Sequence, residues 1–204
     1  MGDHRVFAAA YARLEPRLDA AGLGELRGRL LASARGRVLE VGAGTGANLD
    51  WYPREAVTSI VASEPDGAMR RRLARRLGTW DGPPVVVHSR GLPGLDVDGP
   101  FDTIVCTLVL CSVGDVSGGL AELRSLLHPD GRLLFLEHVG VGGLGGSVQR
   151  LVTPVWARLA GGCRLDRDTI GTLRAAGFVI ANCERPRAWR GAVVVGDALG
   201  RRAA

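Results

Sequence analysis

The sequence predicts an α/β fold: a doubly wound, mostly parallel sheet with helices on both faces and a C-terminal antiparallel hairpin. Three observations lead to this prediction. Short runs that are apolar almost throughout alternate with helix-length amphipathic segments, which is typical of parallel strands covered on both faces. A glycine-rich loop follows the first of these runs. The last two apolar runs lie too close together for a crossover, so they must pair antiparallel.

Two helices are expected before this alternation begins. Between Val6 and Leu31 the apolar residues recur every three or four positions, with an interruption near Gly22. Because these helices lie outside the strand–helix alternation, they are free to cover the open end of a site. We therefore expect residues 1–34 to form a lid.

Five apolar runs predict the parallel strands. In order they are RVLEVG (37–42), TSIVASE (58–64), PVVVHS (84–89), FDTIVCTLVL (101–110) and RLLFLEHV (132–139). Between them, helices are expected to start at ANLDWY (47–52) and to occupy PDGAMRRRLARRLG (65–78) and VSGGLAELRSLLHPDG (116–131). Right-handed crossovers through these helices make the sheet doubly wound.

The pattern changes after residue 139. Glycine-rich stretches flank an amphipathic helix between residues 140 and 163, and a further helix is expected at RDTIGTLRAAG (167–177). FVIANCERP (178–186) and AWRGAVVVGDAL (188–199) are the two strands of the hairpin. With 204 residues, 46% of them hydrophobic, the chain fits a single domain.

Charge and cysteine content exclude several classes of function. The net charge of +5 comes from arginines that are spread along the chain, so no nucleic-acid partner is expected. The four cysteines form no C-x-x-C pair, which argues against a zinc ribbon or a thioredoxin-like redox site; no metal site is expected. No apolar run approaches about 20 residues and the N-terminal residues lack a signal-peptide pattern, so we expect a cytoplasmic protein without a transmembrane segment.

The glycine loop VLEVGAGTGANLD (38–50) allows two interpretations. Gly42, Gly44 and Ala47 fit the dinucleotide fingerprint G-x-G-x-x-[GA]. The same loop reads E-x-G-x-G-x-G from Glu40, which is the first motif of class I S-adenosylmethionine-dependent methyltransferases. An acidic residue inside a buried strand is unfavourable unless a cation needs it, and the methionyl ammonium of this cofactor is such a cation. Glu40 and the C-terminal hairpin therefore favour S-adenosylmethionine.

The expected cofactor site lies at the carboxyl ends of four strands, where open α/β sheets bind ligands. Glu64, at the tip of the second strand, is expected to accept both ribose hydroxyls. HSRG (88–91) is expected beside the adenine ring, and CTLVL (106–110) along the methionine arm. The cofactor-binding residues predicted in this way are Glu40, Gly42, Ala43, Gly44, Gly46, Asn48, Glu64, Pro65, Met69, Ser89, Arg90, Gly91, Cys106, Thr107 and Leu108.

Several stretches resemble one branch of the class I methyltransferases, the methyltransferase-like family that includes alkyl-thiol S-methyltransferases and bacterial relatives. The matching pieces are GAGTGANLDWYP, FDTIVCTLVLCSV, HPDGRLLFLEHV and PVWARLAGGCRLDRDT, which together span about residues 37–169. The resemblance implies a Rossmann-like seven-stranded sheet and methyl transfer to a small, apolar acceptor, with sulfur the leading candidate atom. We expect the single domain, residues 1–204, to consist of the lid (1–34), a cofactor-binding core (35–139) and a substrate-cover helix with the hairpin (140–204).

The catalytic and acceptor-binding residues are expected near the fifth strand. Displacement on the cofactor's methyl needs a nucleophile held about 3 Å from it, and a thiol is already partly ionised at neutral pH. His138 is the candidate base, with a purely hydrogen-bonded histidine as the alternative. Tyr11, Cys111 and Trp156 are expected to contact the acceptor, although a cysteine or tryptophan also fits a core role. Glu137 is expected to face away and to pair with an arginine.

Other functions remain open from the sequence. O- or N-methylation of a hydrophobic metabolite or lipid amine uses the same parts. A non-catalytic, cofactor-binding regulatory protein is an alternative from another class. A third is a peripheral membrane protein that places the arginine- and leucine-bearing helices before Ala34 on anionic lipid.

Overall fold

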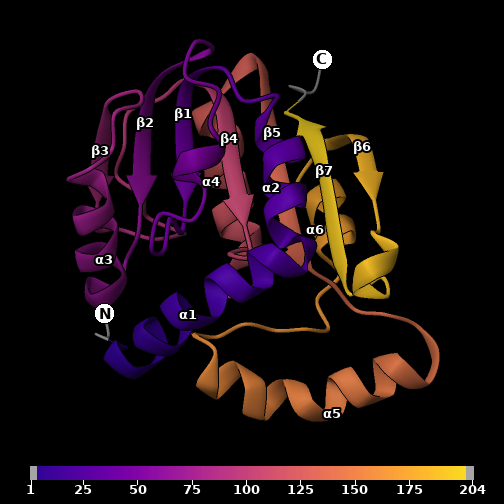
Figure 1. The fold of residues 1–204 in the computed structure, drawn as a ribbon. Helices are drawn as coiled ribbons and strands as arrows, with labels where there is room; N and C mark the ends of the chain where they lie inside the picture. The colour runs from indigo at the N-terminus through magenta and orange to yellow at the C-terminus, as the bar shows by residue number, and fades with distance from the viewer. Residues whose placement is uncertain (1–3, 201–204) are drawn as a thin grey trace.

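The computed structural model describes residues 4–200, which form one seven-stranded sheet in the order β3-β2-β1-β4-β5-β7-β6 (Figure 1). The strands are β1 Gly36–Val41, β2 Val57–Ser63, β3 Val85–His88, β4 Phe101–Thr107, β5 Leu127–His138, β6 Val179–Glu184 and β7 Val193–Leu199. The first five pair in parallel, whereas β7 pairs antiparallel with both β5 and β6. The predicted fold class, including the C-terminal hairpin, is confirmed.

Six α-helices accompany the sheet within residues 4–200. They are α1 Arg5–Leu18, α2 Gly24–Leu31, α3 Gly67–Leu77, α4 Val116–Leu126, α5 Gly143–Leu159 and α6 Thr169–Ala175. Asp66 begins α3 as its N-cap, since its carboxylate accepts hydrogen bonds from the N–H groups of Ala68 and Met69. A π-helical turn, Asp19–Leu23, joins α1 to α2, and Gly22 adopts φ +105° there, which explains the interruption expected at that residue.

The two faces of the sheet are covered by different helices. On one face, leucines of α2 such as Leu26 and Leu30 pack with Val38, Ile60 and Leu134 of the strands. On the other face, Leu120 of α4 and Leu173 of α6 pack against strand residues that point away from the first face. These strand residues include Leu39 of β1, Ile104 of β4 and Phe135 of β5. This arrangement leaves the carboxyl ends of the parallel strands to be covered by other segments.

The segment after β1 differs from the prediction. A helix was expected to start at residue 47, but only a three-residue 3-10 helix, Leu49–Trp51, forms there. The indole of Trp51 packs against α2, where a Cβ on Gly28 would lie 2.8 Å from the ring. The helix α2 therefore covers this face of the sheet beside β1. The expected helix after β1 would have covered the same place. A smaller difference is that α4 ends at Leu126, before the predicted turn at residues 129–131.

Helices α1 and α5 lie at the end of the sheet to which the parallel strands point (Figure 1). The first described residue, His4, fixes the start of α1, because its N–H and its ring Nδ1 lie 2.8 and 3.0 Å from Asp66 Oδ2. Along α5, apolar side chains such as Leu144 and Leu151 remain exposed. None of the helices within residues 4–200 combines the length and the apolar character that crossing a membrane requires.

Candidate active site

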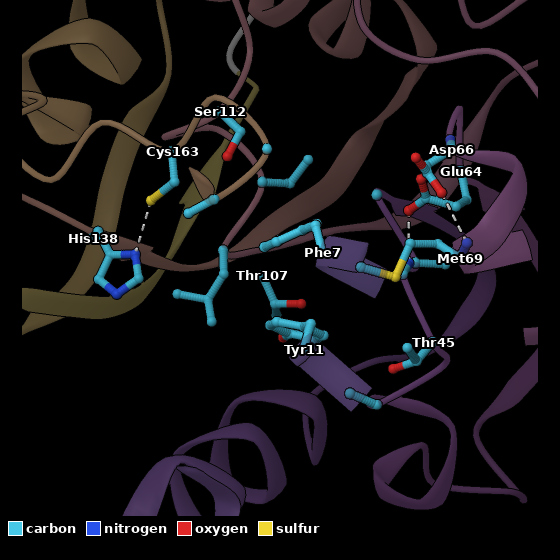
Figure 2. Close-up of a pocket in the computed structure, with 18 of the residues that line it drawn as sticks. Phe7, Tyr11, Thr45, Glu64, Asp66, Met69, Thr107, Ser112, His138 and Cys163 are labelled. Carbon is cyan, nitrogen blue, oxygen red and sulfur yellow. Dashed lines mark hydrogen bonds between the residues drawn. The ribbon is translucent and has the colours of Figure 1, made fainter. Parts of the chain in front are cut away.

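A cavity of about 730 Å³ lies between the carboxyl ends of the strands and the helices α1 and α5. Figure 2 shows Glu64, Asp66 and Met69 at one end, His138 and Cys163 at the other, and Phe7, Tyr11 and Thr107 between them. The volume falls within the range of about 300–1,000 Å³ found for small-molecule sites. One cavity thus joins the predicted cofactor residues to the predicted acceptor residues.

The glycine loop and Glu64 form the first end of this cavity. Gly42 and Gly44 have φ values of +66° and +59°, a conformation that favours glycine. A Cβ on Gly42 would lie 2.4 Å from Val109, so the loop passes close to the β4 turn. The N–H groups of Gly44 and Asp66 each donate to a Glu64 oxygen at 2.8 Å, which fixes the carboxylate at the edge of the cavity. Burial raises the pKa of Glu64.

A second buried carboxylate, Glu40, sits beneath the loop. Its two oxygens accept hydrogen bonds from Asn48 Nδ2 and from the Tyr52 hydroxyl, both at 2.9 Å. Burial raises the pKa of Glu40 to about 7, while these two hydrogen bonds oppose the shift. A carboxylate that is buried and still borders the cavity is suited to a cationic group of a ligand.

Arg27 also lines the cavity, although it was not predicted as a site residue. Its side chain is 2% exposed, and Nη1 donates to Asn48 Oδ1 at 2.7 Å and to Thr107 Oγ1 at 3.4 Å. The helix α2 is thereby tied to the residues around Glu40. A signal was present in the sequence, because Arg27 shares the apolar face of its helix with Leu23 and Leu30.

Three side chains meet at the other end of the cavity: Cys111 after β4, His138 at the end of β5, and Cys163 after α5. The Sγ atoms of Cys111 and Cys163 are 3.5 Å apart, and His138 Nδ1 lies 3.5 Å from Cys163 Sγ and 3.9 Å from Cys111 Sγ. The hydrogen bond from Cys111, together with the His138 ring, holds the pKa of Cys163 well below its ordinary value. Burial alone would lower the pKa of His138, but its contact with Cys163 raises it overall. No spacing motif predicts this cluster, because its members lie 27 and 25 residues apart.

Glu137 does not pair with an arginine, so that prediction is wrong. Its side chain is fully buried, and its two oxygens accept the N–H groups of Val109, Leu110 and Cys111 at 2.8–3.2 Å. These hydrogen bonds give the backbone N–H groups of the turn that follows β4 their acceptors. Glu137 therefore fixes the backbone of Cys111.

Most of the predicted site residues line the cavity. They are Tyr11, Glu40, Gly42, Ala43, Gly44, Asn48, Glu64, Pro65, Met69, Gly91, Thr107, Leu108, His138 and Trp156. The structure therefore brings together residues from α1, α5 and the ends of four strands.

Five predicted site residues lie outside the cavity lining. Gly46 packs on the core, since a Cβ there would meet Leu73 at 2.9 Å. Ser89 and Arg90 are exposed beyond β3, and Gly91 and Leu92 border the cavity in their place. Cys106 packs in the core on the face of the sheet that α4 and α6 cover. Cys111 is buried behind His138 and Cys163.

The residues present fit S-adenosylmethionine. Glu40 offers a buried carboxylate for an ammonium group, and Glu64 offers a second for vicinal hydroxyls. Between them, a Cβ built on Gly44 would meet, apart from its chain neighbours and within the described residues 4–200, only the Gly42 oxygen at 3.9 Å, so a ligand can approach the backbone there.

Comparisons with known proteins show the family of the chain. A profile described as a methyltransferase domain matches residues 5–180. The human thiol S-methyltransferase TMT1B is 33% identical over 175 residues, which cover 79% of this chain and 67% of that protein. Human thiol S-methyltransferase TMT1A is 31% identical over 159 residues, covering 74% of this chain and 65% of that protein. The chain thus spans about two thirds of the length of these relatives.

A solved structure supports the fold. The putative methyltransferase of Haloferax volcanii, solved in complex with its Trm112 activator, superposes with a TM-score of 0.72 at 14% identity, covering 99% of this chain and 100% of that chain. From its sequence motifs, its sheet and the match over most of its length, the chain belongs to the class I S-adenosylmethionine-dependent methyltransferases.

Proposed function

We propose that the protein transfers a methyl group to a small lipophilic thiol. The observation that carries the proposal is the shape and lining of the cavity: beyond the glycine loop it continues between apolar side chains and reaches the pair His138–Cys163. The apolar residues along it include Phe7, Leu14, Leu18, Val113, Trp156 and Leu159. The relatives named thiol S-methyltransferases support the same acceptor class.

The two buried carboxylates orient the cofactor in this proposal. Glu40 receives the ammonium of the methionine arm and Glu64 receives the ribose hydroxyls, while Thr107 and Leu108 lie along the arm between them. When bound, the cofactor supplies an electrophilic methyl group on a sulfonium. The chain's own task is to hold the acceptor sulfur in line with that group and to exclude water.

His138 is the ionisable group that the proposal assigns to the acceptor. It lies at the end of β5, borders the cavity and contacts Cys163 through Nδ1. A thiol is intrinsically nucleophilic once deprotonated and is already partly ionised at neutral pH, so a nearby side chain assists the loss of its proton without being essential for it.

Helices α1 and α5 form the cover over the acceptor in this proposal. Tyr11 of α1 and Trp156 of α5 both border the cavity. The cover is also attached to the cofactor loop, because Thr45 donates a hydrogen bond to Glu15 of α1. Closure of these helices over a bound thiol would keep water from the methyl group.

A panel of acceptors tests the proposal. The protein is incubated with methyl-labelled S-adenosylmethionine and with small thiols, phenols and amines of matched size, and the products are identified by mass. The expected result is a labelled thioether from the lipophilic thiols. Labelled product from phenols or amines, with none from thiols, would instead assign an O- or N-methyltransferase.

A further inference from the structure

We propose that Cys111, His138 and Cys163 bind a zinc ion whose fourth coordination position faces the cavity and receives the acceptor's sulfur. The three potential ligand atoms, two thiol sulfurs and one imidazole nitrogen, lie within 4.8 Å of one another. The inference deepens the proposed thiol methylation and rests on it.

The distances between these atoms are those of a tetrahedral zinc site. With Zn–S bonds of about 2.3 Å and Zn–N bonds of about 2.0–2.1 Å, two sulfurs at tetrahedral angles lie about 3.8 Å apart, and a sulfur and a nitrogen about 3.6 Å apart. The corresponding distances here are 3.5 Å between the sulfurs and 3.5 and 3.9 Å from the sulfurs to Nδ1. An ion fits between the three atoms with shifts of only a few tenths of an ångström.

The backbone around the cluster is held from several sides. Three N–H bonds to Glu137 fix the turn that carries Cys111. The Arg167 guanidinium donates to the carbonyls of Leu110 and Val113 at 2.9 and 2.8 Å, and the Arg164 N–H donates to the Cys111 carbonyl at 2.9 Å. Such support for the ligand-bearing segments is what a preorganised metal site requires.

Two glycines bring Cys163 to this turn. Gly161 and Gly162 have φ values of +60° and +90°, and a Cβ on Gly162 would lie 3.1 Å from the Ser112 carbonyl oxygen. The close approach places the loop after α5 directly against the turn after β4. Residues from three distant parts of the chain therefore converge on one point.

The ligand set also suits an ion that takes part in the reaction. Structural zinc sites have four protein ligands, whereas catalytic sites have three and leave one position open, two cysteines and one histidine being a known combination. Here His138 and Cys163 border the cavity while Cys111 lies behind them. The open position therefore points towards the space assigned to the acceptor, and two thiolates balance the charge of Zn²⁺ in this buried place.

The chemistry balances without a redox partner. On coordination the acceptor R–SH loses its proton to solvent, which the metal promotes by stabilising the thiolate. Its sulfur then forms the new bond to the methyl carbon, and the electron pair of the broken bond goes to the leaving sulfur. The product R–S–CH₃ is neutral and binds the metal weakly. His138 acts in this scheme as a ligand that positions the ion.

Cobalt binding tests the site without any measurement of activity. The full chain is reduced, freed of metal with a chelator and titrated with Co²⁺. We expect one equivalent to bind with the thiolate-to-cobalt charge-transfer band of a tetrahedral site, to be displaced by Zn²⁺, and to change its spectrum when a lipophilic thiol is added. Cys111→Ser and Cys163→Ser should each weaken binding by at least about 100-fold, since losing even an outer-shell partner costs about 10–100-fold.

Cys183→Ser is the matched control, because Cys183 is an exposed free cysteine on β6. It should bind Co²⁺ like the unaltered protein, and all variants should retain their affinity for S-adenosylhomocysteine, which shows that they fold. Failure of the reduced protein to bind Co²⁺, or a Cys111–Cys163 disulfide in place of metal, would overturn the zinc site while thiol methylation stands. Cobalt bound without any response to thiols, and with no thiol methylated, would support the metal and overturn the acceptor.

Discussion

Glu64 illustrates how single residues serve both the fold and the site. Its carboxylate accepts the N–H groups of Gly44 and Asp66 and still borders the cavity. We expect Glu64→Ala to weaken binding of S-adenosylhomocysteine by about 1.5–3 kcal/mol, the usual contribution of hydrogen bonds to a charged acceptor. Calorimetric titration measures this.

Glu122→Ala is the control for that change, because Glu122 also accepts two backbone N–H groups, those of Gly94 and Leu95, but lies outside the cavity lining. It should leave the dissociation constant unchanged. An equal loss in both variants would mean that the Glu64 effect comes from the fold and not from a ligand contact.

Glu40 predicts a pH dependence of cofactor binding. Its pKa in the free protein is about 7, whereas a bound ammonium would favour the ionised carboxylate, so binding must release a proton when the pH lies below 7. Affinity for S-adenosylhomocysteine should therefore rise as the pH increases, by about tenfold from pH 6 to pH 8. Glu40→Gln should bind more weakly at pH 8 and lose this dependence. An identical dissociation constant of the unaltered protein at both values would contradict the role of Glu40.

The predicted residues that do line the cavity include those at the carboxyl ends of the strands. Glu40, Gly42 and Glu64 follow from the motif and its place at the carboxyl ends of β1 and β2. Ser89 and Arg90 lie outside the cavity lining, and nothing in the sequence shows how far a short edge strand extends before the chain turns outwards. Of the three residues predicted after β3, only Gly91 borders the cavity.

Among the elements, α2 couples the N-terminal segment to the cofactor loop through Arg27. Replacing Arg27 by Met removes the hydrogen bonds to Asn48 and Thr107 and the ion pair with Asp19. We expect the free energy of unfolding to fall by about 2–3 kcal/mol, with weaker cofactor binding, because charged hydrogen bonds are lost and buried partners are left unpaired. Chemical denaturation and cofactor titration measure the two effects.

Arg29→Met provides the comparison on the same helix. Its ion pair with Glu184 is half exposed on both sides, and such pairs contribute about 0–1 kcal/mol. Equal destabilisation by the two substitutions would contradict the coupling of α2 to the loop through Arg27.

The helix expected after β1 shows where element prediction fails. ANLDWY has a helical pattern, yet the structure has only Leu49–Trp51 as a 3-10 helix before Pro53. Whether a short apolar segment continues as a helix depends on what packs beside it, and here Trp51 fits against Gly24 and Gly28 of α2. Such a tertiary contact between distant segments leaves no local signal.

For the whole molecule, the sheet was predictable because buried parallel strands are apolar on both faces and the final hairpin is short. The cluster of Cys111, His138 and Cys163 was not, because its members reach one point only through the ends of β4 and β5 and the glycine loop after α5. The sheet can thus be predicted from the apolar pattern of the sequence. The acceptor end of the cavity depends on tertiary contacts between distant segments, which the sequence pattern does not show.

The proposed thiol methylation is best tested by the kcat/KM for an alkyl thiol, compared with that for the alcohol of the same carbon skeleton at saturating S-adenosylmethionine. Both acceptors fit the same apolar walls, so the ratio isolates the reacting atom. We expect a clear preference for the thiol, because sulfur ionises more readily and is the better nucleophile. A kcat/KM for the alcohol that equals or exceeds that for the thiol would contradict it.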